Sequence, residues 1–217
     1  MISMTRRSQK QRFLMLAAST AVIAGGVLLP SSAFAAAPET PHVGGVTTRG
    51  AGHGDHSHHG IAKPAVKWVK TTDSPSGITV KLPGKATVQK VSAPAGATTV
   101  TGRVYSVKTD DGLVGFAVLD LPGGQENLND GLQGFLEGYN EVSRDTLTST
   151  SSQKTTIDGH PALDARLSTK GGDRKVGAAR FIADDTHIVQ AVTLGSAANE
   201  KDVDLIHRQI LASIRFP

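Results

Sequence analysis

Short runs of alternating apolar and polar residues, separated by turn residues, recur after residue 76 and restrict this chain to a largely antiparallel sheet. Such alternation turns every second side chain of a strand toward the core. The predicted strands span residues 78–82, 100–107, 113–121, 163–167, 176–183 and 187–194. Residues 113–121 are almost continuously apolar, which is typical of a central strand covered on both faces. The Asp-Asp-Gly turn at 110–112 predicts a hairpin, and the last three strands are expected to form an antiparallel meander.

Two segments with helical spacing interrupt and follow these strands. One is expected after an N-cap at Asn127, and the other begins near Asn199 with Asp202 in its first turn. Their apolar faces comprise Leu128, Leu132, Phe135, Leu136, Tyr139 and Val142 in the first helix, and Val203, Ile206 and Ile210 in the second. The stripe Gly131, Gly134 and Gly138 predicts close backbone packing, and residues 143–156 are expected to form a Ser/Thr-rich loop leading into an exposed strand. This order predicts an α+β fold, a largely antiparallel sheet with two main helices packed on it.

The amino terminus has the three parts of a secretory signal peptide. A basic stretch ending at Arg12 precedes an apolar run from Phe13 to Leu29, and Ala33-Phe34-Ala35 supplies the small residues that signal peptidase reads. We therefore expect a signal at residues 1–35, cleaved after Ala35, and a secreted, extracellular protein. Polar residues follow the Arg6-Arg7 pair, so the general secretory route is favoured over twin-arginine export. The apolar run is marginal as a membrane span, and no stable membrane insertion is expected after cleavage.

Residues 36–65 are rich in Gly, Pro and His and show no apolar periodicity, so we expect a disordered linker. Its segment GHGDHSHHG carries His53, Asp55, His56, His58 and His59. Imidazole is a ligand suited to Zn, Cu or Ni, and a glycine-containing chain can wrap four imidazoles around one ion. The sequence leaves two interpretations of this tail, a transition-metal site or a solvated polar spacer.

Charge and the absence of cysteine exclude several classes of function. The chain has 23 basic and 19 acidic residues, and four of the basic ones, but no acid, fall in the expected signal. The remaining 19 basic and 19 acidic side chains balance, which argues against general binding to nucleic acid or to an anionic membrane. A chain without cysteine has no disulfide, no thiolate metal site, no cysteine nucleophile and no lipid-modified cysteine.

Residues 66–217 have the size of a single domain, and they contain no recognised catalytic motif. Asp158 and His160 form a candidate acid–base pair, although an ordinary turn is the favoured interpretation. The carboxylate pairs at 110–111 and 184–185 also fall in predicted turns. We expect His187 at a solvated strand end and His207 in a partly buried packing role on the last helix. No catalytic or cofactor-binding residue is predicted, and the protein is not expected to be an enzyme.

Several turns and strand ends of this domain resemble the PsbP-like fold. They are Trp68 and the segments SGITVKLPG (76–84), VLDLP (118–122), IDGHP (157–161) and SIRF (213–216). The resemblance covers about residues 66–217, and within that superfamily the chain resembles uncharacterised bacterial secreted proteins of an actinobacterial type. It implies an α+β sandwich and a non-enzymatic binding role, and it supplies no catalytic motif.

The sequence therefore predicts a secreted, non-catalytic binding protein for an unknown protein or small ligand, with a His-rich tail as a candidate site for Zn, Cu or Ni. Two alternatives stay open: a secreted hydrolase with an unrecognised active site, and a cell-wall-associated structural protein. A pocket that gathers Asp158, His160 and a third polar group would favour the hydrolase.

Overall fold

The computed structural model describes residues 66–95, 98–110, 112–121, 128–171 and 174–217. The predicted signal, the linker and the Asn127 N-cap lie outside these residues. The strands are β1 (Val69–Thr72), β2 (Thr79–Leu82), β3 (Thr87–Ala95), β4 (Thr98–Thr109), β5 (Gly112–Asp120), β6 (Thr146–Ile157), β7 (His160–Lys170), β8 (Lys175–Ala183) and β9 (His187–Ser196). The helices are α1 (Leu128–Val142) and α2 (Glu200–Ser213).

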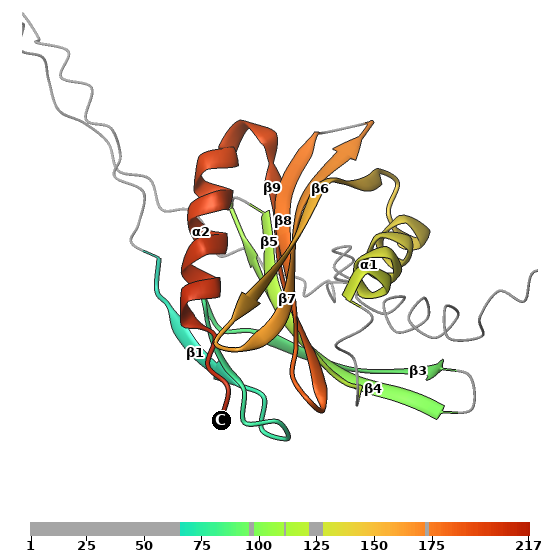
Figure 1. Ribbon diagram of the computed structural model, residues 1–217. Helices are drawn as coiled ribbons and strands as arrows, with labels where there is room; N and C mark the ends of the chain where they lie inside the picture. The colour runs from blue at the N-terminus through green and yellow to red at the C-terminus, as the bar shows by residue number, and fades with distance from the viewer. Residues whose placement is uncertain (1–65, 96–97, 111, 122–127, 172–173) are drawn as a thin grey trace, which may run out of the picture. The chain divides into compact units, whose positions relative to one another are not determined.

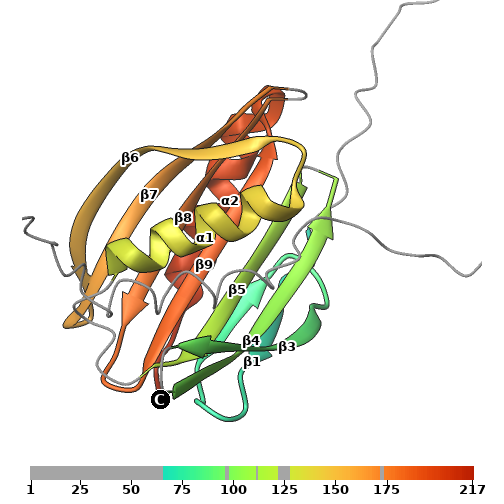
Figure 2. The same ribbon diagram turned by 90° about the vertical axis from the view of Figure 1, so that its right-hand side faces the viewer.

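Seven of the strands form one antiparallel sheet in the order β3-β4-β5-β9-β8-β7-β6, and β1 and β2 form a separate hairpin. Helix α1 covers one face of the sheet and α2 covers the other (Figure 1). Figure 2 shows α1 lying across the strands in front of the sheet. The predicted hairpin, formed by β4 and β5, and the predicted meander, formed by β7, β8 and β9, are both confirmed.

Each face of the sheet carries its own hydrophobic core. On the α1 face, Phe135 of the helix meets Phe181 of β8 edge-on, with ring centroids 6.4 Å apart. On the α2 face, Phe116 of β5 packs with Ile206 and Ile210 of the helix, and its ring stacks on Tyr105 at 4.5 Å. Strand β5 contributes to both cores, which explains its continuous apolar sequence.

The glycine stripe of α1 faces the sheet. A Cβ added at Gly131 would lie 3.5 Å from the Phe181 ring, an ordinary contact, and Gly134 and Gly138 are buried. At Gly131 the helix therefore meets the Phe181 side chain at an ordinary distance, and the close backbone approach predicted for the stripe is not found there.

Three strands differ from the sequence prediction. The segment 143–156, expected to be a loop leading into an exposed strand, is mostly that exposed strand, because β6 starts at Thr146 and pairs with β7 along its length, with a register shift between Ser149 and Ser151. Strands β1 and β3 were not predicted at all. Edge strands such as β3 and β6 expose most of their side chains, so they lack the apolar alternation on which a sequence prediction depends.

Candidate functional site

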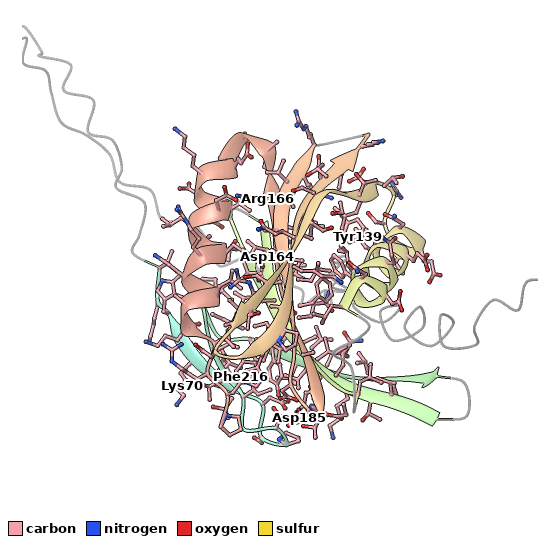
Figure 3. All side chains as sticks on the ribbon, in the orientation of Figure 1. Lys70, Tyr139, Asp164, Arg166, Asp185 and Phe216 are labelled. Carbon is pink, nitrogen blue, oxygen red and sulfur yellow. The ribbon has the colours of Figure 1, made fainter. Side chains whose placement is uncertain are left out.

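A groove of about 480 Å³ lies between α2 and the β6–β7–β8 end of the sheet, and we call it the α2 groove. Its lining includes Asp204, His207 and Arg208 of α2 and Asp164 and Arg166 of β7. Figure 3 shows Asp164 and Arg166 between the strands and α2. On β7 the alternation places Leu163, Ala165 and Leu167 in the α1-side core, so the charged residues between them face α2. A groove of this volume is in the usual range for small-ligand sites.

His207 is the most deeply buried polar group of the α2 groove, with 7% of the residue exposed. Its Nδ1 lies 3.1 Å from Thr193 Oγ1 on β9, and its Nε2 has no hydrogen-bond partner among the described residues. Burial, reinforced by the nearby Arg180 guanidinium, lowers the pKa of His207 to about 4. The ring is therefore neutral at neutral pH, and one ring nitrogen stays available to a bound molecule.

The charged residues of the α2 groove are only partly paired. Arg180 donates to both oxygens of Asp164, its partner across the β7–β8 pair, with the Nη2–Oδ2 distance at 2.7 Å. Arg166 forms an ion pair with Asp204 of α2. Arg208 has no ion-pair partner in the described part of the chain. Among the charged residues that line the groove, Arg208 is thus the cation left without a carboxylate, which favours a ligand with a negatively charged group.

A second polar cluster lies between β4 and the turn that follows β1, and its centre, Asp73, is fully buried. Arg103 Nε and Nη2 donate to the two oxygens of Asp73, each at 2.8 Å, and Tyr105 Oη donates to Asp73 Oδ1 at 2.8 Å. Ser76 Oγ donates a further hydrogen bond to Asp73 Oδ2 at 2.6 Å. Arg103 also forms an ion pair with Asp120. Asp73 is 0% exposed, so this cluster fastens the hairpin to the sheet and offers no access to a ligand.

The pKa shifts in this cluster follow from its hydrogen bonds. Burial alone would raise the pKa of Asp73, but the bonds from Arg103, Ser76 and Tyr105 outweigh it and hold the pKa well below the ordinary value. Burial and the bond to Asp73 raise the pKa of Tyr105 to about 12. The carboxylate is therefore charged and the phenol neutral throughout the physiological range.

His187 lies at the start of β9, and the prediction of a solvated strand end was wrong. The residue is half-buried, with Nδ1 3.2 Å from Asp184 Oδ2 and Nε2 3.8 Å from Asp120 Oδ1. The pairing of β5 with β9 brings Asp120 opposite His187, a contact that depends on strand register. Asp184 accepts from the backbone N–H groups of Thr186 and His187, which makes it a turn residue, as predicted.

The structure separates the other candidates from the α2 groove. Asp158 is exposed in the β6–β7 turn at φ 50°, and the His160 ring lies on Phe216 with centroids 4.5 Å apart. Neither residue lines the groove. Asp110 is exposed in the β4–β5 turn, and Asp111 lies outside the described residues. His207, expected in a partly buried packing role, is buried and also lines the α2 groove.

Within the described ranges, no group of three His, Asp or Glu side chains is placed to hold a metal ion. The predicted metal residues His53, Asp55, His56, His58 and His59 lie outside those ranges. No helix in the part of the chain that the structure describes has the length and apolar character needed to cross a bilayer.

Comparisons with known proteins bear on the fold. No family model and no curated protein matches this chain. Among solved structures it is similar to cyanobacterial PsbP from Synechocystis sp. PCC 6803, with a TM-score of 0.50 and 12% identity, over 73% of this chain and 96% of that one. A Pseudomonas aeruginosa protein of unknown function is similar at a TM-score of 0.37 and 10% identity, over 66% and 93% of the two chains. Together with the antiparallel sheet and its two helices, the cyanobacterial likeness shows that the described domain has a PsbP-like fold.

Proposed function

We propose that the protein is a secreted, non-catalytic binding protein whose ligand site is the α2 groove. Secretion is supported by the signal-like residues 1–35, which also favour a place among the secreted bacterial proteins, of actinobacterial type, with this fold. The observation that carries the binding role is His207, a buried imidazole with one nitrogen unbonded in a polar groove. Buried polar groups normally have partners, so an unbonded one in a groove points to a ligand.

The charges of the α2 groove define the ligand class. Arg208 is an exposed guanidinium without an ion pair, and it follows His207 directly in α2. A small molecule with a carboxylate would pair with Arg208 and place a hydroxyl or carbonyl against His207 Nε2. The ion pairs Arg180–Asp164 and Arg166–Asp204 hold the walls of the groove in place.

Titration of citrate into the ¹⁵N-labelled protein tests this site by nuclear magnetic resonance. We expect saturable shifts confined to residues 164–166 and 204–211. Arg208→Gln is expected to weaken binding about tenfold, because a charge-assisted hydrogen bond contributes about 1.5–3 kcal/mol. The control is Arg144→Gln, which removes the same charge from an exposed position after α1. Shifts spread evenly over the surface, or equal weakening by both substitutions, would contradict the proposal.

We further propose that the His-rich tail binds a transition metal ion. The support is the segment 53–59, with four imidazoles and one carboxylate in seven residues. Calorimetric titration with Zn²⁺, Cu²⁺ and Ni²⁺ at neutral pH is expected to give micromolar or tighter binding to the purified chain. Replacing His53, His56, His58 and His59 with asparagine is expected to abolish it.

The matched control for the tail replaces His160, His187 and His207 with asparagine in the folded domain. This variant should keep the metal affinity of the wild-type chain. Affinity that survives loss of the four tail histidines would contradict the metal-binding role and move attention to the domain. Binding no tighter than millimolar in the wild-type chain would leave the tail as a spacer.

A further inference from the structure

A second groove, of about 610 Å³, lies between α2 and the β1–β2 hairpin, and we call it the hairpin groove. Lys70 and Lys81 line it from the hairpin, beside Trp68, and Gln209 and Arg215 line it from α2 and the residues that follow. Lys70 is labelled on β1 in Figure 3. Both lysines, Gln209 and Arg215 are exposed, so the groove is open along the surface rather than enclosed.

The hairpin groove is strongly and uniformly basic. It has three cationic side chains, and no carboxylate is among the residues that line it. Lys70 and Lys81 are direct partners in the β1–β2 register, and none of the described carboxylates forms an ion pair with either. Like charges directly opposite one another in adjacent strands are destabilising. An anion bound between the two ammonium groups would remove this repulsion.

The walls of the groove are held by backbone contacts. Thr79 and Arg215 exchange two backbone hydrogen bonds, at 3.0 and 2.9 Å, and Lys81 N donates to Ser213 Oγ at 2.9 Å. The Arg215 guanidinium donates to the carbonyl of Ala212 at 2.9 Å and so covers the carboxyl-terminal end of α2. The partial negative charge of that helix end is thereby offset, and the cations are presented on a fixed frame.

Trp68 narrows the choice of anion. It lies just before β1 and lines the groove together with Lys70, and its ring is half-buried against the α2-side core. An indole beside cations offers a flat apolar surface for the C–H face of a sugar ring. In this arrangement the cations would pair with a carboxylate on the sugar, and Gln209 would form a hydrogen bond with one of its hydroxyl groups. The balanced charge outside residues 1–35 argues against phosphate polymers, whose binding depends on an extended positive surface.

We propose that the hairpin groove binds a carboxylated polysaccharide, with Lys70 and Lys81 on a uronic acid carboxylate and Trp68 against a sugar ring. An acidic peptide would supply carboxylates but no ring for the indole face. This site is independent of the α2 groove, which is lined from other positions of α2.

Fluorescence of Trp68 tests the proposal directly, because it is the single tryptophan of the chain. Polygalacturonate is titrated at low ionic strength, with neutral dextran and poly-glutamate in parallel. We expect a saturable change in emission with polygalacturonate alone, and an affinity that falls as salt is added. The double substitution Lys70→Gln with Lys81→Gln is expected to weaken this binding at least tenfold.

The control is Lys108→Gln, an exposed lysine of β4 that does not line the groove, and it should bind as the wild type does. Thermal unfolding of the double variant should occur no lower than that of the wild type, because a like-charge pair is removed. Four outcomes overturn the proposal: equal binding of dextran, a stronger response to poly-glutamate, a double variant that binds polygalacturonate as tightly as the wild type, or no response to any polymer.

Discussion

Replacing Asp73 with alanine is expected to lower the free energy of unfolding by about 3–5 kcal/mol, because it breaks a buried ion pair from one side. The carboxylate accepts hydrogen bonds from Arg103, Tyr105 and Ser76 at a position that is 0% exposed. Its loss leaves a buried guanidinium with Asp120 as its one remaining carboxylate partner, and it leaves the Tyr105 hydroxyl without its acceptor. Urea unfolding followed by circular dichroism measures the change.

Asp120→Ala serves as the comparison for this experiment. Asp120 bonds the same guanidinium, but its side chain is 36% exposed, so we expect a loss of about 1 kcal/mol or less. The double variant Asp73→Leu with Arg103→Met should be more stable than Asp73→Ala alone, since no unpaired charge stays buried. A loss below about 1 kcal/mol for Asp73→Ala would mean that water replaces the carboxylate and that the cluster does not fasten the hairpin.

The strands that bury side chains on both faces are those that sequence patterns predict best. Strand β5 contributes side chains to both the α1-side and the α2-side core. Its apolar run from Leu113 to Leu121 therefore identified it as a central strand. Strand β6 has the opposite character. Its Ser/Thr-rich residues 149–154 pair with β7 through the backbone while most side chains face solvent, so no apolar period marks it. Turn residues located the hairpins correctly because glycine and aspartate act locally.

The α2 groove, in contrast, depends on contacts between distant segments. Its helix was predicted, and so was the burial of His207 beside the apolar face. The pairing of Asp164 with Arg180 depends on the β7–β8 register, and Arg166 reaches Asp204 only because α2 crosses that end of the sheet. Asp164 and Arg166 alternate with the apolar residues of β7, and their side chains are partly exposed. The same alternation is typical of any strand with one face in solvent, so the sequence alone does not distinguish a polar groove from an open surface.

When the pH falls from neutral to 4, we expect His207 to lower the free energy of unfolding by about 3 kcal/mol. The pKa of this buried ring is about 4 in the folded state, against 6.5 for an ordinary histidine. The unfolded chain therefore takes up a proton first as the pH falls below 6.5, and protonation favours unfolding until the folded ring also titrates near 4. Burial has the largest effect on the pKa of His207 and lowers it. The positive charges of Arg180 and Arg166 also lower this pKa, whereas the carboxylates of Asp164 and Asp204 raise it.

The measurement compares wild type and His207→Gln by urea unfolding across this pH range. Glutamine retains a hydrogen-bonding group for Thr193 but does not titrate, so carboxylates elsewhere in the chain cancel in the difference. The stability of the wild type relative to the variant should be constant above about pH 7.5 and should fall by about 3 kcal/mol toward pH 4. Parallel curves over the whole range would show that His207 protonates in the fold as readily as in the unfolded chain. The ring would then be open to water, and its unbonded nitrogen would no longer point to a ligand in the α2 groove.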